Sequence, residues 1–423
     1  MFNWAGNYAF QAADVHEPET LDSVRRRVAA AAKVRVIGNR HSFTDLPDSP
    51  GGTLLSLSAM NRVVSIDPDT RRPTVTVEGG ISYGQLAPVL QAAGYALHNL
   101  ASLPHITVAG ATATATHGSG EGNGSLSTSV SALELVTADG DVRTLRRGEA
   151  DFDGAVVGLG ALGVVTKLTL DLVPAFDVAQ FIYRRVPVAN FIANYDAILA
   201  SAYSASVFTN WQSEAFEQVW MKCLADRPHF DLTTIGGTPA EAAVHPIENV
   251  PGMPPFVGND PEKSTVQCGV PGPWHARLPH FKFEHTPSSG EELQSEFFVP
   301  REHAAAAFAA IADLRDEIRP LIQVSELRVV APDELWLSPY YRRPTVGIHF
   351  TWRRDPAGVA ALVRQIEEKL APFDMRPHWA KVFTPQPERM SGLYPKWNAF
   401  RDLVRRYDPN GKFRNPFMDR HGL

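Results

Sequence analysis

The sequence predicts an α+β protein built from two domains. The chain has 423 residues, which is more than one ordinary hydrophobic core accommodates. Between residues 21 and 142, short segments rich in valine and threonine alternate with helical stretches. From about residue 179 to 330, stretches rich in proline and glycine, such as residues 245–279, separate segments with helical spacing. We therefore expect an N-terminal α+β domain followed by a second domain that binds the substrate.

Individual elements stand out by the spacing of their apolar residues and by their end signals. Period-two alternation predicts strands at residues 34–37, 164–170, 324–329 and 348–352. Helical spacing predicts helices at residues 82–93, 301–318 and 397–407. The last helix ends before Pro409 and Gly411, which are residues that stop a helix.

Composition excludes several classes of partner. The hydrophobic fraction is 44%, and no uninterrupted apolar run approaches the ~20 residues that a membrane-spanning helix needs. The first residues lack the basic and apolar segments of a secretion signal, so we expect a cytoplasmic protein with no membrane partner. The net charge is -6 with no lysine and arginine block, which argues against nucleic acid. Cys223 and Cys268 lie far apart without metal-type spacing, so we expect free thiols and no metal.

The most informative stretch is an alternation of alanine and threonine that ends in a glycine-rich loop. Thr112, Thr114 and Thr116 alternate with alanines and precede residues 117–124, HGSGEGNG. Such small residues leave backbone N–H groups open to a large anionic ligand, because no side chain blocks close approach. Residues 38–43, GNRHSF, form a similar tight polar turn after a predicted strand. Two such loops predict a nucleotide cofactor.

A third glycine-rich segment argues against a Rossmann fold. Residues 158–163, GLGALG, match the dinucleotide-binding fingerprint G-x-G-x-x-G. That fingerprint works only between a preceding strand and a following helix. Here a helix-like segment at residues 152–157 comes first and the β-rich segment 164–170 follows, with no suitably placed acidic residue. We therefore expect no Rossmann-type NAD site.

Charged residues on one predicted strand face indicate a polar cavity wall. Glu326 and Arg328 are two residues apart and project from the same face of their strand. A surface ion pair is the common alternative, and such pairs contribute little to stability. The flanking residues are apolar, which favours a cavity. His349 and Thr351 share one face of their strand by the same rule.

Lys381 lies among Trp379, Val382 and Phe383, an apolar setting that could lower the pKa of a lysine. The alternative is a lysine whose stem lies on the domain boundary with its ammonium group in water. Spacing alone favours this boundary lysine.

Several segments together resemble a known family. The chain resembles the flavin domain of the vanillyl-alcohol-oxidase (PCMH-type) superfamily, and within it most of all the alditol (xylitol/sorbitol) oxidases. The segments that carry this resemblance are residues 38–43 (GNRHSF), 101–106 (ASLPHI), 112–120, 133–140 (LELVTADG), 325–328 (SELR), 349–352 (HFTW), 378–381 (HWAK) and 408–413 (DPNGKF). The set spans nearly the whole chain. It implies a FAD-binding domain at residues 1–178, completed by residues 382–423, and a cap (substrate) domain with a central antiparallel sheet at residues 179–381.

The resemblance also implies roles for individual residues. The expected FAD-binding residues are Gly38, Asn39, Arg40, His41, Ser42, Ser102, Thr107, Gly110, Ala111, Thr112, Ala113, His117, Gly118 and Val165. The expected substrate-binding residues are Ser102, Glu326, Arg328, Thr351 and Lys381, and of these Glu326, Arg328 and Lys381 are the expected catalytic residues. Ala101 matches the position beside the flavin where a small side chain lets oxygen in.

His41 has two interpretations. An isolated histidine in a turn is most often a solvent-facing residue or a cap. In the resembled family the histidine of this motif forms a covalent bond to the 8α-methyl group of the flavin, and a neutral imidazole is a competent nucleophile near pH 7. We therefore expect His41 to hold FAD covalently. Neither cysteine lies in a motif that resembles a second tether.

The resemblance predicts a FAD-dependent oxidase that converts the terminal primary alcohol of an alditol to an aldose. Hydride transfer to flavin N5 and reduction of O2 to H2O2 are the expected chemistry, with Lys381 or Arg328 at the reacting hydroxyl. We expect a monomer whose partners are a polyol and O2. Three alternatives remain open: an aldonolactone oxidase or dehydrogenase, a flavin dehydrogenase that uses a quinone or cytochrome, and a non-enzymatic flavin-binding protein.

Overall fold

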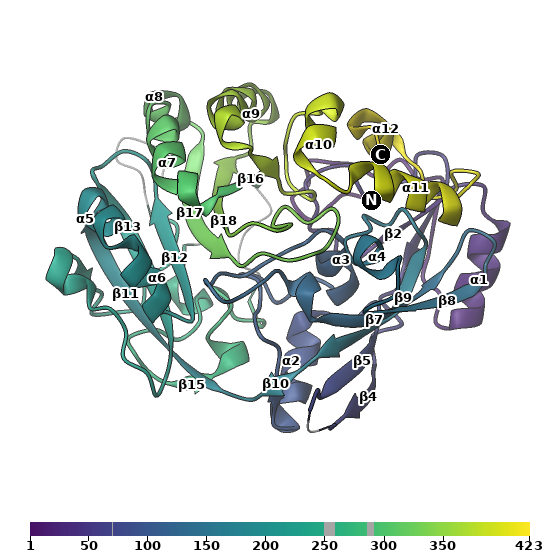
Figure 1. The fold of residues 1–423 in the computed structure, drawn as a ribbon, viewed down its shortest axis with the longest axis horizontal. Helices are drawn as coiled ribbons and strands as arrows, with labels where there is room; N and C mark the ends of the chain where they lie inside the picture. Colours follow the sequence, from purple (N-terminus) through teal and green to yellow (C-terminus); the bar gives the residue numbers. More distant parts are fainter. Residues whose placement is uncertain (70, 249–258, 286–291) are drawn as a thin grey trace.

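The described residues of the N-terminal region of the computed structural model form two larger sheets and a short two-stranded ribbon (Figure 1). The structure describes residues 1–423 except 70, 249–258 and 286–291, so part of the proline- and glycine-rich stretch at 245–279 lies outside the described residues. The first sheet is parallel and has the order β1-β3-β2 (Asp14–His16, Thr53–Ser56 and Val34–Ile37). The second is antiparallel and has the order β4-β5-β9-β7-β8 (Val63–Asp67, Thr74–Glu78, Val164–Asp171, Val130–Val136 and Val142–Arg146). A short ribbon pairs β6 (Tyr95–Ala96) with β10 (Val173–Pro174).

Several helices lie in the described part of this region. They are α1 (Leu21–Ala30), α2 (Tyr83–Ala92), α3 (Val108–Ala113) and α4 (Phe152–Val156). The hydroxyl of Ser82 accepts from the backbone N–H of Gln85 at 3.3 Å, and the side chain of Gln85 accepts from the N–H of Ser82 at 3.0 Å. This capping box fixes the start of α2, because it satisfies two N–H groups that the first helical turn leaves free.

The order of elements around residues 158–163 is the one that the sequence predicts. Helix α4 comes before the glycines and strand β9 comes after them. This is the reverse of a Rossmann phosphate loop.

A nine-stranded antiparallel sheet dominates the second half of the chain (Figure 1). Its main path is β14-β11-β13-β12-β17-β18-β16-β19, and β15 pairs with β11. The strands are β11 (Asp177–Pro187), β12 (Ser204–Thr209), β13 (Ala215–Leu224), β14 (Thr238–Pro239), β15 (Gly272–Pro273), β16 (Glu292–Pro300), β17 (Ile322–Val330), β18 (Thr345–Arg353) and β19 (Arg376–Pro377). Strands β17 and β18 confirm the strands expected at 324–329 and 348–352.

Helices cover one face of this sheet. They are α5 (Val188–Ala193), α6 (Tyr195–Ser201), α7 (Ala304–Ala312), α8 (Arg315–Ile318) and α9 (Pro356–Leu370). Ile348 and Phe350 of β18 belong to the same buried apolar cluster as Ile311 of α7 and Ile366 of α9. Because side chains alternate along a strand, His349 and Thr351 face the opposite side.

The helix expected at residues 301–318 is broken. A turn at Asp313 and Leu314 separates α7 from α8, and the N–H of Leu314 bonds the carbonyl of Ile311 at 2.9 Å. The turn brings the side chains of Leu314 and Ile318 into the apolar cluster under the sheet. Core burial therefore overrides the continuous helical spacing of the sequence.

The C-terminal helices return to the N-terminal region (Figure 1). They are α10 (Pro387–Leu393), α11 (Trp397–Tyr407) and α12 (Pro416–His421), and α11 confirms the helix expected at 397–407. Phe400 and Leu403 share a buried cluster with Phe152 and Val156 of α4. Leu335, Leu337 and Tyr340 join the same cluster. None of the described helices is both long and apolar enough to cross a membrane.

Candidate active site

One continuous cavity brings together residues from both halves of the chain. Every FAD-binding and substrate-binding residue expected from the sequence lines this cavity except Gly118, and Ala101 lines it too. Gly118 follows His117 in the chain, and a Cβ at Gly118 would lie 2.3 Å from the carbonyl oxygen of Leu100. Gly118 therefore permits close packing of two backbone segments beside the cavity.

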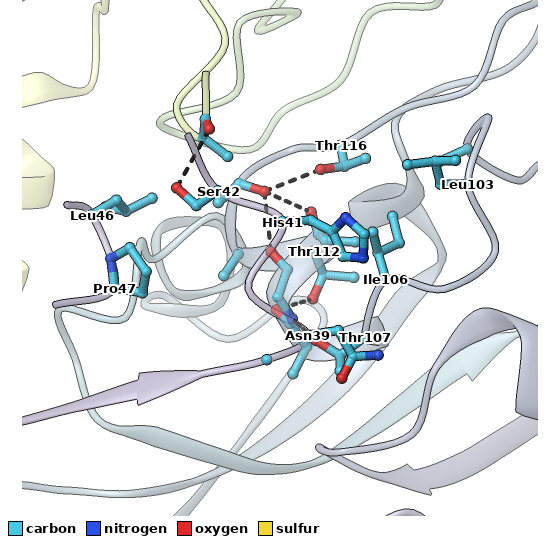
Figure 2. A pocket seen from close by; sticks show the side chains of 18 of the residues that line it. Asn39, His41, Ser42, Leu46, Pro47, Leu103, Ile106, Thr107, Thr112 and Thr116 are labelled. Carbon is cyan, nitrogen blue, oxygen red and sulfur yellow. Dashed lines mark hydrogen bonds between the residues drawn. The ribbon is translucent and has the colours of Figure 1, made fainter. Parts of the chain in front are cut away.

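One end of the cavity presents backbone donors from the loop after β2. Within the described chain, the N–H groups of residues 39–42 have no hydrogen-bond acceptor. A Cβ at Gly38 would lie 2.3 Å from the hydroxyl of Thr107, so this loop sits tightly against the start of α3. Figure 2 shows His41 and Ser42 beside Thr112 and Thr116 around the pocket. Free N–H groups in a small-residue cradle fit the pyrophosphate of a dinucleotide.

Other segments fix this loop in place. The N–H of Phe43 donates to the carbonyl of Ala380 at 2.8 Å, and the side chain of Asn39 donates to the carbonyl of His105. The loop is therefore joined both to the residue before Lys381 and to the segment that carries Ala101 and Ser102.

His41 is half-buried at this end of the cavity. Its ring lies 4.9 Å from the ring of Trp4. Burial, together with the nearby His105 and Arg40 side chains, lowers the pKa of His41 to about 4. The imidazole is therefore neutral at pH 7, as a nucleophilic nitrogen must be.

The other end of the cavity is a polar wall on the open face of the nine-stranded sheet. The strand register places Glu326 of β17 and Glu296 of β16 opposite His349 on the strand between them. Arg328 lies opposite Gly347. A Cβ at Gly347 would lie 3.2 Å from a carboxylate oxygen of Glu296, so the glycine leaves room for Arg328 to reach across β18.

Glu296 is the centre of this wall. Its side chain is fully buried, and it accepts hydrogen bonds from Arg328 at 2.7 Å and from Lys381 at 2.7 Å. The Nε2 atom of His117 lies 3.0 Å from the same carboxylate. Burial by itself raises the pKa of Glu296, but the positive charges of Arg328 and Lys381 hold this pKa well below its usual range. This carboxylate therefore stays ionised and holds two cations in place.

Glu296 is not among the site residues expected from the sequence. The available signal was only an acidic residue that directly precedes the apolar run Phe297, Phe298 and Val299. Its partners are at least 32 residues away in the chain, so no local spacing connects them.

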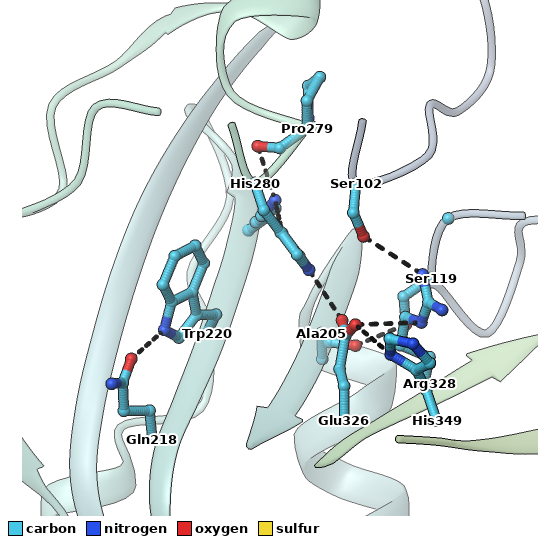
Figure 3. A network of polar contacts seen from close by, with 12 residues as sticks. Ser102, Ser119, Ala205, Gln218, Trp220, Pro279, His280, Glu326, Arg328 and His349 are labelled. Carbon is cyan, nitrogen blue, oxygen red and sulfur yellow. Dashed lines mark hydrogen bonds and ion pairs between the residues drawn. The ribbon is translucent and has the colours of Figure 1, made fainter. Parts of the chain in front are cut away.

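Glu326 has its own set of partners (Figure 3). His280 lies 2.8 Å from one carboxylate oxygen, and the Nε atom of Arg328 lies 3.5 Å from the other. Arg328 also donates to the hydroxyl of Ser102 at 3.3 Å. Burial by itself raises the pKa of Glu326, but Arg328 and His280 hold this pKa well below its usual range. The buried cavity wall expected for Glu326 and Arg328 is therefore present, and the surface ion pair is not.

Lys381 is not a boundary lysine with its ammonium group in water. Its side chain is only 13% exposed, and its nearest charged partner is Glu296. Burial lowers the pKa of Lys381, against the raising effect of that carboxylate. Burial also lowers the pKa of His349 to about 4, so its ring is neutral beside the lysine.

Two buried polar atoms of the wall lack a hydrogen-bond partner in the described part of the chain. They are the Nε of Arg328, which is a donor, and the Nδ1 of His349. Buried polar groups in proteins are almost always paired. Both atoms lie near the same carboxylate oxygen of Glu326, the Nε of Arg328 at 3.5 Å and the Nδ1 of His349 at 3.8 Å, so a hydroxyl group bound there could pair with the donor and with the ring nitrogen. Over the same described ranges, no group of three or more histidine, cysteine or acidic side chains is arranged to hold a metal ion.

Comparisons with known proteins agree with this geometry. Residues 12–146 match the family described as "FAD binding domain", and residues 289–421 match the family described as "D-arabinono-1,4-lactone oxidase". A protein of Streptomyces sp. (strain IKD472 / FERM P-14339) named alditol oxidase is 48% identical over 98% of this chain and 97% of its own length. The chain belongs to the alditol oxidase family. The expected superfamily is thereby confirmed.

Other known proteins resemble this chain at lower sequence identity. L-gulono-1,4-lactone dehydrogenase of Mycobacterium tuberculosis is 29% identical over 99% of this chain and 98% of its own. L-gulonolactone oxidase of Mus musculus is 27% identical over 99% and 97%. Cholesterol oxidase from B. sterolicum has a TM-score of 0.78 at 16% identity, covering 99% of this chain and 96% of its own. That structural likeness confirms the α+β fold class, and the family match over residues 12–146 confirms the FAD-binding domain within it. The domain boundaries and the roles of single residues stay predictions.

Proposed function

We propose that the protein is a FAD-dependent oxidase that converts the terminal primary alcohol of alditols such as xylitol and sorbitol to the aldose. The observation that carries the proposal is the buried wall of Glu296, Glu326, Arg328 and Lys381, which continues from a cradle of free backbone N–H groups in one cavity. The 48% identity to a protein named alditol oxidase supports it.

The residues at the nucleotide end suit FAD. The N–H groups of residues 39–42 would bind the pyrophosphate, and His41 would form the covalent bond to the 8α-methyl group. When bound there, FAD would supply the hydride acceptor, N5, and the means of reducing O2 to H2O2. Ala101 would leave space for oxygen beside the ring.

The polar wall would bind and polarise the alcohol. Arg328 donates its free Nε to the reacting oxygen and stabilises the negative charge that develops there. Lys381 in its neutral form accepts the hydroxyl proton, because burial lowers its pKa. Glu326 accepts a hydrogen bond from the neighbouring hydroxyl, and Ser102 and Thr351 bind the rest of the polyol.

A lactone is the second candidate substrate. The match of residues 289–421 to the arabinonolactone oxidase family favours it, as do the gulonolactone enzymes among the relatives. A lactone offers a secondary ring alcohol and no extended polyol chain, so it would leave part of the polar wall without a partner.

One set of assays tests the proposal. We expect the purified protein to stay yellow in the acid precipitate and to release H2O2 with xylitol and sorbitol faster than with L-gulono-1,4-lactone. Faster turnover of the lactone would favour the second candidate. Turnover only with a quinone or cytochrome would indicate a dehydrogenase, and a yellow protein inert toward all of these would indicate a binding protein. We also propose a cytoplasmic monomer, which fractionation and gel filtration would test.

A further inference from the structure

A buried lysine lies behind the proposed substrate-binding carboxylate. Lys222 of β13 is only 1% exposed, and its side chain is among the largest that the protein buries completely. It contacts the segment of Leu278, Pro279 and His280, which lies between β13 and the cavity. Figure 3 shows His280 of this segment reaching from Pro279 toward Glu326. The proposed mechanism gives no role to Lys222.

The three donors of the lysine ammonium have three acceptors. The Nζ atom donates to the carbonyl oxygens of Leu278 at 2.5 Å and Pro279 at 3.1 Å, and it lies 3.0 Å from the Nδ1 of His280. An ammonium group has three N–H donors and no acceptor. The Nδ1 of His280 must therefore present a lone pair to the lysine.

This contact fixes where His280 carries its proton. Burial, together with the positive charge of Lys222, lowers the pKa of His280 to about 4, so its ring carries one proton at neutral pH. With Nδ1 accepting, that proton is on Nε2, which lies 2.8 Å from Glu326. In the other tautomer, a lone pair of Nε2 would face the carboxylate and repel it, so Lys222 and Glu326 favour the same tautomer from opposite sides of the ring.

We propose that Lys222 is a positioning residue that fixes the tautomer of His280, so that His280 donates to Glu326 and holds this carboxylate in place for a substrate hydroxyl. The effect on substrate rests on the proposed function, whereas the tautomer itself does not. Glu326 also faces Arg328 and His349, so two of its neighbours act from the sheet and His280 acts from outside it. The ring of Trp220, with its centroid 5.9 Å from the Nζ atom, covers the lysine and helps to exclude water.

The first test measures the tautomer directly in the flavin-loaded protein. The wild type and Lys222→Met are labelled with 15N-histidine, and their histidine signals are compared at pH 6. This pH is below the pKa of Lys222, which burial lowers to about 7, so the lysine carries its charge. A His280→Gln variant identifies the His280 signals. We expect a protonated Nε2 and an unprotonated Nδ1 in the wild type, and a shift toward protonated Nδ1 in Lys222→Met. The same tautomer in both proteins would overturn the proposal.

The second test asks whether the lysine acts through Glu326. We expect Lys222→Met to lower kcat/KM for xylitol by about 10- to 100-fold, the range of coupling in one hydrogen-bond network. In a Glu326→Gln background the same change is expected to have less than about a threefold effect, because the amide no longer needs the Nε2 donor. Equal losses in both backgrounds would show that Lys222 acts through packing alone.

Matched variants separate positioning from folding. Lys282→Met removes a lysine whose amine donates to the backbone of Glu262, and it is expected to change neither the His280 signals nor kcat/KM. If Lys222→Met does not fold, Lys222→Gln is measured in the same way and is expected to give mixed tautomers. If the wild type does not oxidise xylitol but Lys222→Met still shifts the tautomer of His280, the proposed function is wrong. The role of Lys222 in positioning Glu326 would then remain supported.

Discussion

Glu296 carries the sharpest prediction, because one fully buried carboxylate holds both proposed catalytic cations. One oxygen of Glu296 faces both His117 and Arg328, and the other oxygen accepts from Lys381. Glu296→Gln keeps the shape of the side chain but replaces one oxygen with an N–H2 group. In either orientation of the amide, N–H donors face at least one cation, and the negative charge is lost.

The expected loss of stability follows from the burial of the ion pairs that Glu296 forms with Arg328 and Lys381. Removing one partner of a buried ion pair costs about 3–5 kcal/mol. Unfolding entropy of about 2.1 cal/mol/K per residue gives about 0.9 kcal/mol/K for the 423 residues. We therefore expect the Tm of Glu296→Gln to fall by about 3–6 °C in calorimetry. Glu134→Gln is the control, because Glu134 pairs with Lys167 at the partly exposed surface and such pairs contribute about 0–1 kcal/mol.

The catalytic effect has a signature in pH. Without Glu296 the ammonium of Lys381 loses the charge that raises its pKa, so its neutral, proton-accepting form appears at lower pH. We expect the acidic limb of the reduction rate to move to lower pH, while the maximal rate falls by about 10²-fold or more because the lysine and arginine are no longer held. The assay is anaerobic stopped-flow reduction by xylitol. A Tm within 1 °C of the wild type together with an unshifted pH profile would refute the argument.

Four further predictions concern single residues. His41→Ala is expected to release its FAD on acid precipitation while the wild type keeps its colour in the pellet, and covalent FAD in the variant would exclude His41 as the tether. Because the pKa of His41 is lowered to about 4, apoprotein is expected to attach FAD at the same rate from pH 5 to 8, whereas an ordinary imidazole would lose rate below about pH 6.5. Ala101→Leu is expected to slow reoxidation by O2 much more than reduction by polyol, and equal effects in stopped-flow traces would argue against oxygen entry there. Lys381→Met is expected to slow reduction at saturating xylitol by about 10²-fold or more, whereas Thr351→Ala chiefly raises KM, and a near-wild-type rate in Lys381→Met would remove the lysine from the proposed mechanism.

The sequence by itself determined the elements that depend on neighbouring residues. The Ser82 and Gln85 capping box marks the start of α2, because both partners lie within one helical turn. The period-two spacing of Glu326 and Arg328 determined that both lie on one face of β17. The reversed order of helix and strand around residues 158–163 argues against a Rossmann site, because both elements adjoin the glycines in the chain. In each case the physical cause acts over a few residues.

Only the tertiary structure decided which charges meet. Glu296 and Glu326 both lie opposite His349 because of the register of three separate strands, and that register follows from burial of the opposite, apolar face of the sheet. The contact of Lys222 with His280 depends in the same way on how a loop packs against β13. Desolvation in that packing, which no residue spacing encodes, sets the pKa values of His41 and Lys381.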